Sequence, residues 1–368
     1  MSSESNNQVS KEVSLINVAV AVIHHKEQYL LGFRNAAQHQ GNRYEFVGGK
    51  IDGGSESAEQ AVIREVAEET GITIHDNTVV KLGRLHHDYG DKQVSLQVYK
   101  IELTAQQYEQ YKECQQGLEG QALTWVDKAD LLAGKYQLPA ANKTILKWLS
   151  IPAKIVITYP LAHFSAHSDP AVAWLQYHQE NLAVSALVYI RIKGVAIASD
   201  AMTVQLMRLR PDILVILPYD HNTQNLNAKD SITEKTAALN QVAAYHLTQS
   251  ALMQWSNNDQ DISTSDQTLS KTHPLIVSCH DAASIQAANK LARIRLQQQL
   301  PPVIGAFLSP ILATQTHPDE QPLGWEAWSE LAQLADMPII GLGGLSPTMI
   351  DQALQYGGIS VAGIRQFS

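Results

Sequence analysis

The chain has 368 residues, enough for two domains that each bury a core of their own. Hydrophobic residues make up 45% of the chain and charged residues 17%, which is typical of a globular protein and excludes a mainly disordered one. A net charge of −9 argues against binding to polymeric nucleic acid, because such a surface normally needs a basic field.

The first residues and the cysteines indicate the cellular compartment. Met1 to Lys11 are polar and lack the apolar centre of a signal peptide. No apolar stretch reaches the length of a membrane span, so we expect no membrane association. The two cysteines, Cys114 and Cys279, offer no disulfide framework and suit a reducing compartment. The sequence therefore predicts a cytoplasmic protein in which residues 1–12 form a flexible tail.

Residues 13–150 are predicted to form a mixed α/β domain. The run 16–23 is apolar and rich in β-branched residues, as in a strand that is buried on both faces. Residues 28–34 follow it as the second strand of a hairpin. Residues 79–88 and 92–103 are expected to form a second hairpin, with further short strands at 43–47 and 122–126 and a closing helix at 139–149.

A glycine-rich loop, 48–54, leads into a short helix that Gly71 ends. Glu65, Glu68 and Glu69 lie three and four residues apart, so they share one face of this helix. Adjacent carboxylates repel one another, and a divalent cation removes that penalty. Oxygen ligands of this kind suit Mg²⁺ or Mn²⁺. The simpler alternative is a solvated acidic face, which leaves the glycine loop unexplained.

The stretch from Gly49 to Ile72 resembles the signature of the Nudix hydrolases. That signature is a glycine, then a glutamate, then Arg-Glu-hydrophobic-x-Glu-Glu-x-Gly-hydrophobic, and Glu56 followed by Arg64 fits it. Six residues separate Gly49 from Glu56, one more than in the family pattern, and we expect the loop to absorb the extra residue. The resemblance implies an α/β/α sandwich and metal-dependent cleavage of a diphosphate bond.

Within this family, the first domain is similar to the MutT branch, which removes pyrophosphate from oxidised guanine nucleotides. Three segments carry the similarity: residues 45–50, which read Glu-Phe-Val-Gly-Gly-Lys, residues 117–121, which read Gly-Leu-Glu-Gly-Gln, and residues 138–142, which read Leu-Pro-Ala-Ala-Asn. Val47 stands where the branch usually has proline.

The similarity implies roles for individual residues. The metal would be held by Gly48, Glu65, Glu68, Glu69 and Glu119. Catalysis would use Glu65, Glu68, Glu119, Arg64 and Lys50, with Arg64 paired to a carboxylate such as Glu56 rather than to substrate. The nucleotide would contact Arg34, Glu45, Phe46, Lys92 and Asn142. Packing in the hydrophobic core would explain a phenylalanine at position 46 equally well.

Residues 151–368 are predicted to form a (β/α)₈ TIM-type barrel, because eight apolar runs alternate with helical stretches. The runs are 154–159, 186–192, 213–217, 243–247, 275–280, 303–308, 339–343 and 359–364. The polar stretch 257–271 is expected to be a loop.

This second domain resembles thiamine-phosphate synthase and its TenI-like relatives. The matching segments are residues 189–193, 245–247, 278–280, 309–318 and 341–345. The resemblance implies a ligand site at the carboxyl ends of the strands, formed by Arg191, Lys193, Ser278, Thr314, Thr316, Gly343 and Gly344. A phosphorylated small molecule is the expected ligand there, with the glycine pair cradling its phosphate.

Three departures from the synthase pattern argue against full synthase activity. The Asn-Asp pair after the third strand is missing from 217–220. Ala251 stands where the synthase has a magnesium-binding aspartate, and His317 replaces the lysine of a Thr-x-Thr-Lys clamp. We expect an enzyme that converts 8-oxo-dGTP to 8-oxo-dGMP and pyrophosphate, with a barrel that is either degenerate or binds a phosphorylated ligand. The alternatives are a bifunctional enzyme of thiamine metabolism and a hydrolase regulated by a non-catalytic sensing barrel.

Overall fold

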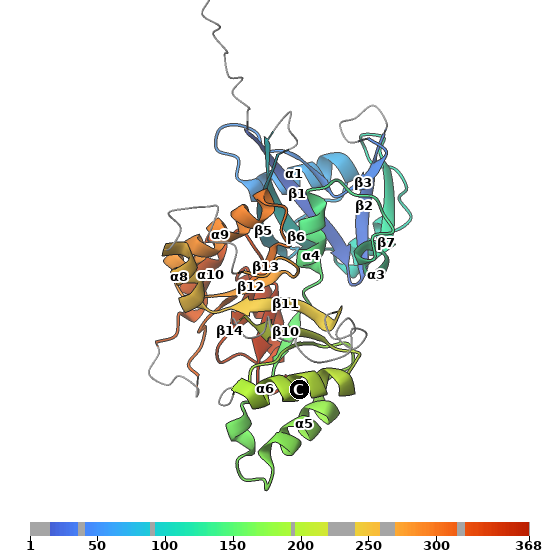
Figure 1. Cartoon of the computed structure of the whole chain (residues 1–368). Helices are drawn as coiled ribbons and strands as arrows, with labels where there is room; N and C mark the ends of the chain where they lie inside the picture. The colour runs from blue at the N-terminus through green and yellow to red at the C-terminus, as the bar shows by residue number, and fades with distance from the viewer. Residues whose placement is uncertain are drawn as a thin grey trace, which may run out of the picture.

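The computed structural model describes residues 15–35, 41–88, 93–192, 196–219, 240–257, 269–314 and 321–367. The predicted tail at residues 1–12 and most of the predicted loop at 257–271 lie outside these ranges. The chain forms a mixed sheet domain followed by a closed barrel, with α4 between them (Figure 1).

The sheet domain contains seven strands and four helices within its described residues. The strands are β1 (Leu15–His25), β2 (Gln28–Arg34), β3 (Arg43–Glu45), β4 (Val47–Lys50), β5 (Val79–Asp88), β6 (Gln93–Glu102) and β7 (Ala122–Asp127). The helices are α1 (Ala58–Thr70), α2 (Ala105–Tyr111), α3 (Lys128–Leu132) and α4 (Asn142–Leu149). The main sheet has the order β3-β2-β1-β6-β5, while β4 pairs with β1 and β7 pairs with β2.

Both predicted hairpins are confirmed, since β1 pairs antiparallel with β2 and β5 pairs antiparallel with β6. The prediction of one strand over 43–47 is wrong, because Phe46 separates β3, which pairs with β2, from β4, which pairs with β1. The helix expected from residue 139 begins at Asn142 instead. Its first turn is a tighter one, with Asn142 N donating to Pro139 O at 3.0 Å.

Successive side chains of β1 point to opposite faces of the sheet, so the sheet domain has two cores. Ala19 and Ala21 belong to the core beneath α1, together with Val62 of that helix. Val20 and Val22 point to the opposite face and belong to the core that α4 covers. The sheet is therefore sandwiched between α1 on one side and α4 on the other.

The predicted barrel is confirmed, with eight parallel strands closed in the order β10-β11-β12-β13-β14-β15-β8-β9. The strands are β8 (Lys154–Ile157), β9 (Leu187–Tyr189), β10 (Leu214–Pro218), β11 (Val242–Leu247), β12 (Leu275–Cys279), β13 (Val303–Leu308), β14 (Ile339–Leu342) and β15 (Ser360–Gly363). Each lies within or overlaps one of the eight apolar runs.

Helices connect the barrel strands. They are α5 (Pro170–Asn181), α6 (Ala196–Leu209), α8 (Gln249–Asn257), α9 (Ala282–Gln297), α10 (Gly324–Leu334) and α11 (Ile350–Gln355), with short 3₁₀ turns at Leu161–Phe164 and Pro347–Met349. Cys279 is fully buried in the barrel core, as expected of a core cysteine. No described helix is long and apolar enough to cross a membrane.

Candidate functional site

Helix α1 is fixed at both ends, so its acidic face has a defined position. A capping box at its start joins Ser57 Oγ to Gln60 N at 3.1 Å and Gln60 Oε1 to Ser57 N at 2.8 Å. Gly71 ends the helix with φ of 76°, a left-handed conformation, and its N–H donates to Ala67 O. The prediction that Gly71 ends this helix is confirmed.

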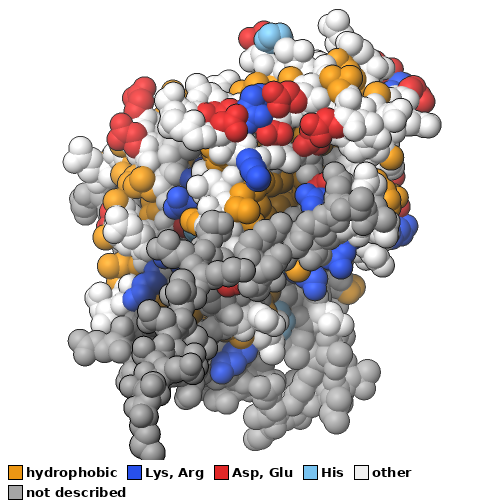
Figure 2. All heavy atoms as spheres, turned by 90° about the horizontal axis from the view of Figure 1, so that it is seen from above, with side chains coloured by type: hydrophobic (Ala, Val, Ile, Leu, Met, Phe, Trp, Pro, Cys, Tyr) orange, Lys and Arg blue, Asp and Glu red, His pale blue; other side chains and the backbone are white. Residues whose placement is uncertain are grey.

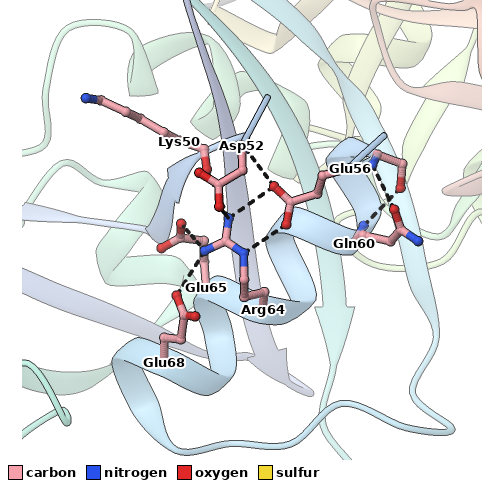
Figure 3. Close-up of polar contacts among 8 residues, drawn as sticks. Lys50, Asp52, Glu56, Gln60, Arg64, Glu65 and Glu68 are labelled. Carbon is pink, nitrogen blue, oxygen red and sulfur yellow. Dashed lines mark hydrogen bonds and ion pairs between the residues drawn. The ribbon is translucent and has the colours of Figure 1, made fainter. Parts of the chain in front are cut away.

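Arg64 lies at the centre of the acidic cluster (Figure 3). Its Nε donates to Glu56 Oε1 at 2.8 Å, and its Nη1 donates to Glu65 Oε1 at 2.8 Å and to Glu68 Oε2 at 2.9 Å. Its Nη2 also donates to the carbonyl of Lys50 at 3.1 Å, which ties α1 to β4. The predicted pairing of Arg64 with Glu56 is confirmed, and hydrogen bonding to Arg64 lowers the pKa of Glu56.

The glycines of β4 let two carboxylates approach the backbone. A Cβ at Gly49 would lie 2.3 Å from the carboxylate of Glu65, so any other residue there would displace this carboxylate from the strand. The N–H of Gly48 donates to Glu69 Oε1 at 3.1 Å. Burial raises the pKa of Glu69 to about 7, against the opposing effect of this hydrogen bond. Glu65 and Glu69 thus both meet β4, while Glu68 is more exposed.

Sequence reasoning missed Gln121, which holds Glu69 from the other side. Its Nε2 lies 3.2 Å from Glu69 Oε2 and 3.3 Å from Glu69 O. Gln121 belongs to the segment 117–121 that contains Glu119, so its place in that segment was the available signal. Glu119 itself is exposed, and its charge contributes to the raised pKa of Glu69.

A pocket of about 240 Å³ opens beside the acidic cluster. It is lined by Ile16, Val18, Val20, Arg34, Glu45, Phe46, Gly48, Gly49, Lys50, Val94, Leu96, Pro139 and Asn142. The view onto this end of the sheet domain shows acidic side chains gathered in one band with hydrophobic side chains exposed next to it (Figure 2). Five predicted substrate or catalytic residues therefore share one pocket: Arg34, Glu45, Phe46, Lys50 and Asn142.

Asn142 combines burial with an unpaired side chain. Only 7% of the residue is exposed, and its side-chain amide forms no hydrogen bond with any residue in the described ranges. Phe46 is 4% exposed and belongs to the hydrophobic core as well as to the pocket wall, so it packs in the core and its contact with a nucleotide stays a prediction.

Arg34 and Glu45 form an ion pair across β2 and β3, between Nε and Oε2. Burial raises the pKa of Glu45 even though Arg34 acts in the opposite direction. Lys50 is exposed, and its side chain points away from the carboxylates around Arg64 (Figure 3). Lys92 lies outside the described residues.

The residues present fit a divalent cation by their chemistry. Glu65, Glu68 and Glu69, with the Gly48 carbonyl, offer only oxygen donors, and Gly49 leaves room for a carboxylate against the strand. In the described part of the chain no three acidic, histidine or cysteine side chains converge on one point, and Glu65 and Glu68 are hydrogen-bonded to Arg64 instead. Metal binding would require Glu65 and Glu68 to give up some of these contacts with Arg64.

The barrel brings several of its predicted ligand residues to the carboxyl ends of the strands. Ser278 Oγ lies 2.7 Å from His246 Nε2, and the N–H of Arg191 donates to Thr158 Oγ1 at 2.9 Å. Gly343 and Gly344 have left-handed φ values of 99° and 71°.

A Cβ at Gly343 would lie 2.7 Å from Pro310 Cα, so the glycine pair also serves close packing against the loop after β13. Thr314 follows that loop, and Lys193 and Thr316 lie outside the described residues.

Comparison with known proteins matches each domain to a family. Residues 18–148 match the NUDIX domain family, and residues 235–367 match the thiamine monophosphate synthase family. The 8-oxo-dGTP diphosphatase of Escherichia coli K12 is 31% identical over 132 residues, which are 36% of this chain and 93% of that protein. The CTP pyrophosphohydrolase of the same organism is 32% identical over 135 residues, 37% of this chain and 91% of that protein.

The barrel has a shorter match. The putative thiamine-phosphate synthase 2 of Aquifex aeolicus is 35% identical over 60 residues, which span 16% of this chain and about a third (32%) of that protein. Among solved structures, the MutT protein of Methanosarcina mazei is 26% identical, with a TM-score of 0.30, over 38% of this chain and 94% of that one. The chain belongs to the Nudix hydrolase family, in its MutT-like part, and carries a thiamine-phosphate synthase/TenI-type barrel as a second domain.

Proposed function

We propose that the sheet domain hydrolyses a purine nucleoside triphosphate of the 8-oxo-dGTP class to the monophosphate and pyrophosphate, with Mg²⁺ as cofactor and Mn²⁺ as a substitute. One observation carries the proposal. A single pocket joins Gly48 and Gly49, which contact the carboxylates of α1, to the side-chain amide of Asn142, which has no hydrogen-bond partner among the described residues. A nucleotide offers a charged phosphate chain at one end and a hydrogen-bonding base at the other.

The base end of the pocket depends on Asn142. Its side-chain amide opens onto the pocket, so a base that binds there gains a direct hydrogen bond worth about 0.5–1.5 kcal/mol net of the water it replaces. The side chain has one acceptor oxygen and two donor hydrogens, which match the mixed donor and acceptor edge of a purine. The face of Phe46 offers a stacking surface beside it.

The phosphate end depends on α1. A divalent cation held by Glu65, Glu68, Glu69 and the Gly48 carbonyl, with Glu119 as a further ligand, would neutralise phosphate oxygens and lower the pKa of a water molecule. Arg64 keeps Glu56, Glu65 and Glu68 in place by charge-assisted hydrogen bonds. Lys50 is exposed and lines the pocket, and its ammonium group would neutralise charge on the departing pyrophosphate.

The reaction consumes one water molecule. The water oxygen bonds to the β-phosphorus, the bond from that phosphorus to the α–β bridging oxygen breaks, and this oxygen leaves on the nucleoside monophosphate. A carboxylate of the acidic cluster accepts the proton of the water. Arg34, which lines the pocket in an ion pair with Glu45, would contact the phosphate or sugar end of the nucleotide.

The decisive experiment replaces one carboxylate of α1. Glu68→Gln keeps the shape of the side chain and removes its charge, so hydrolysis of 8-oxo-dGTP with Mg²⁺ should fall at least about 100-fold in kcat while the fold is retained. Glu59→Gln is the matched control, because Glu59 lies exposed in the first turn of the same helix, away from Arg64. Its kcat should stay within about twofold of the parent value.

Turnover by Glu68→Gln equal to that of the parent would remove α1 from the mechanism. The same assay includes dGTP and CTP, since one relative is a CTP pyrophosphohydrolase. A kcat/KM that is higher for CTP than for both purine nucleotides would replace the purine assignment with a pyrimidine one.

We further propose that the barrel binds a phosphorylated small molecule and does not synthesise thiamine phosphate. The left-handed turn at Gly343 and Gly344 supports a phosphate contact, and Ala251, at the start of α8, supplies no carboxylate for a metal. Formation of thiamine phosphate by the full chain from the pyrimidine pyrophosphate and thiazole phosphate would contradict this. A cytoplasmic location stays a prediction that rests on the two free cysteines.

A further inference from the structure

The sheet domain and the barrel share buried contacts. Trp148, near the end of α4, is 2% exposed, and its Nε1 donates to the carbonyl of Val303 at the start of β13, at 3.2 Å. Arg84 of β5 forms an ion pair with Asp336 at 2.9 Å, and its N–H donates to the carbonyl of Asp336 at 3.2 Å. These contacts lie at the amino-terminal ends of β13 and β14, opposite the carboxyl ends where the predicted barrel ligand site lies.

The interface is closely packed. A Cβ at Gly83 would lie 2.7 Å from Asp336 O and 2.9 Å from Trp148 Cη2, so the strand, the helix and the barrel meet at this one glycine. The cavity left between β5, α4 and α9 has a volume of about 10 Å³, no more than a water molecule fills. One hydrophobic core runs from Val20 in β1 through Ile145 in α4 to Ile304 in β13. Domains joined only by a linker normally meet through smaller and more polar contacts.

Helix α4 therefore belongs to two sites. Its first residue is Asn142, which lines the nucleotide pocket, and its seventh is Trp148, which is bound to the barrel. Six residues of helix span only roughly 9 Å, and a helix of this length moves as one body. Any displacement of Trp148 is consequently passed on to Asn142.

We propose that the barrel positions the base-binding end of the nucleotide pocket, with Trp148 as the positioning residue that acts through α4. The inference rests on the proposed function in that the pocket holds a nucleotide. The barrel then serves the hydrolase whether or not it binds a ligand of its own. Loosening the contact to Val303 should weaken nucleotide binding and base discrimination, and leave the phosphate chemistry at α1 unchanged.

The test is Trp148→Phe in the full chain, which removes the indole N–H and keeps an aromatic ring. We expect KM for 8-oxo-dGTP to rise by between about twofold and tenfold, with kcat within about twofold of the parent, and the preference for 8-oxo-dGTP over CTP to fall. Gly83→Ala, which wedges the same contact apart from outside the pocket, should act in the same direction.

Two tryptophans provide matched controls, because each also donates its indole N–H to a backbone carbonyl. Trp125 in the sheet domain donates to Tyr111 O at 3.3 Å and packs in the core on the α1 side. Trp328 in the barrel donates to Leu308 O at 3.1 Å. Trp125→Phe and Trp328→Phe should leave KM and base preference unchanged.

A measurement that needs no activity completes the test. Amide hydrogen exchange in residues 139–149 should be faster in Trp148→Phe than in the parent and in both controls. Unchanged exchange in this segment, or an equal rise in KM in Trp125→Phe, would overturn the inference. A parent protein that hydrolyses no nucleotide would instead count against the proposed function, and the exchange data would still decide whether the barrel holds α4.

Discussion

Arg64 shows what a single residue contributes to the candidate site. The sequence predicts its partner, Glu56, because the family signature places both residues, and the ion pair is present. It does not predict that the same guanidinium also holds Glu65, Glu68 and the Lys50 carbonyl. That arrangement depends on the approach of β4 to α1, which is a tertiary contact. The planar group with five donors is what makes four contacts possible, and lysine could not replace it.

Gln121 and the unpaired amide of Asn142 illustrate the limit of sequence reasoning at this scale. Both residues lie in segments that resemble the MutT branch, and only Asn142 received a role from the resemblance. The contact of Gln121 with Glu69 joins residues 52 positions apart, and no local pattern marks it.

His178 makes the stability of the barrel depend on pH. It is fully buried in α5, where Nε2 accepts from Tyr159 N at 3.1 Å and Nδ1 lies 2.7 Å from Trp174 O, so the ring is neutral. Burial lowers its pKa to about 4. Between pH 6.5 and 4 the unfolded chain binds more protons at His178 than the folded chain does. The stabilisation of the fold by the neutral His178 is therefore complete above pH 6.5 and is lost as the pH falls through that window.

We expect His178 to contribute about 3 kcal/mol to the acid destabilisation between pH 7 and pH 4. His178→Leu should lower Tm at pH 7.5 and flatten the dependence of Tm on pH, measured by thermal unfolding at half-unit steps. His75→Leu, at an exposed position, should keep the parent slope. A His178→Leu slope as steep as that of the parent would show that other groups, such as the buried His24 and His246, carry the effect.

At the scale of elements, the sequence predicts most of the fold. All eight barrel strands are found within or overlapping the predicted runs, because a parallel strand buried on both faces leaves a continuous apolar run. The errors fall where tertiary contacts decide. Residues 43–47 divide into β3 and β4 since each half pairs with a different strand, and the parallel pairing of β1 with β6 has no sequence signal.

The end of α1 offers a prediction at this scale. Gly71 has φ of 76°, and the nearest atom to an added Cβ would be Leu118 Cδ1 at an ordinary 3.5 Å, so the cost of Gly71→Ala is conformational rather than steric. We expect a loss of about 1–2 kcal/mol in the free energy of unfolding, measured by urea titration.

Gly53→Ala is the control for this measurement. Gly53 lies in the exposed loop that contains the extra residue before Glu56, and its Cβ would meet nothing within 4 Å. Stability should change by less than about 0.5 kcal/mol. Equal losses of unfolding free energy in both variants would mean that the left-handed conformation of Gly71 is not the cause of the loss.

At the scale of the whole molecule, the sequence predicts two domains and is silent on how they meet. We propose a boundary at residues 150 and 151, between α4 and β8. The residues that join the domains, Gly83, Arg84, Trp148 and Asp336, carry no motif, and the ion pair links positions 252 residues apart. Such a contact is visible only once both folds are formed.

Arg84 should stabilise the contact between the two domains, because its ion-pair partner in the barrel, Asp336, has a side chain that is only 5% exposed. Removing Arg84 leaves a buried carboxylate without its partner, which is more costly than the loss of a surface pair. We expect Arg84→Ala to lower the free energy of unfolding by about 1–3 kcal/mol. Lys112→Ala, which removes an exposed pair with Glu109, should leave the free energy of unfolding unchanged within the error of the measurement.

A double-mutant cycle separates the charge from the packing. In the Asp336→Asn background no carboxylate is left unpaired, so Arg84→Ala should cost less there by about 1 kcal/mol or more. Thermal unfolding of each variant gives the cost of Arg84→Ala in each of the two backgrounds. A separate low-temperature transition in Arg84→Ala would indicate that the domains have come apart. Equal costs in the two backgrounds would show that Arg84 contributes through its aliphatic packing and its N–H, and that the domains are joined mainly by the core around Trp148.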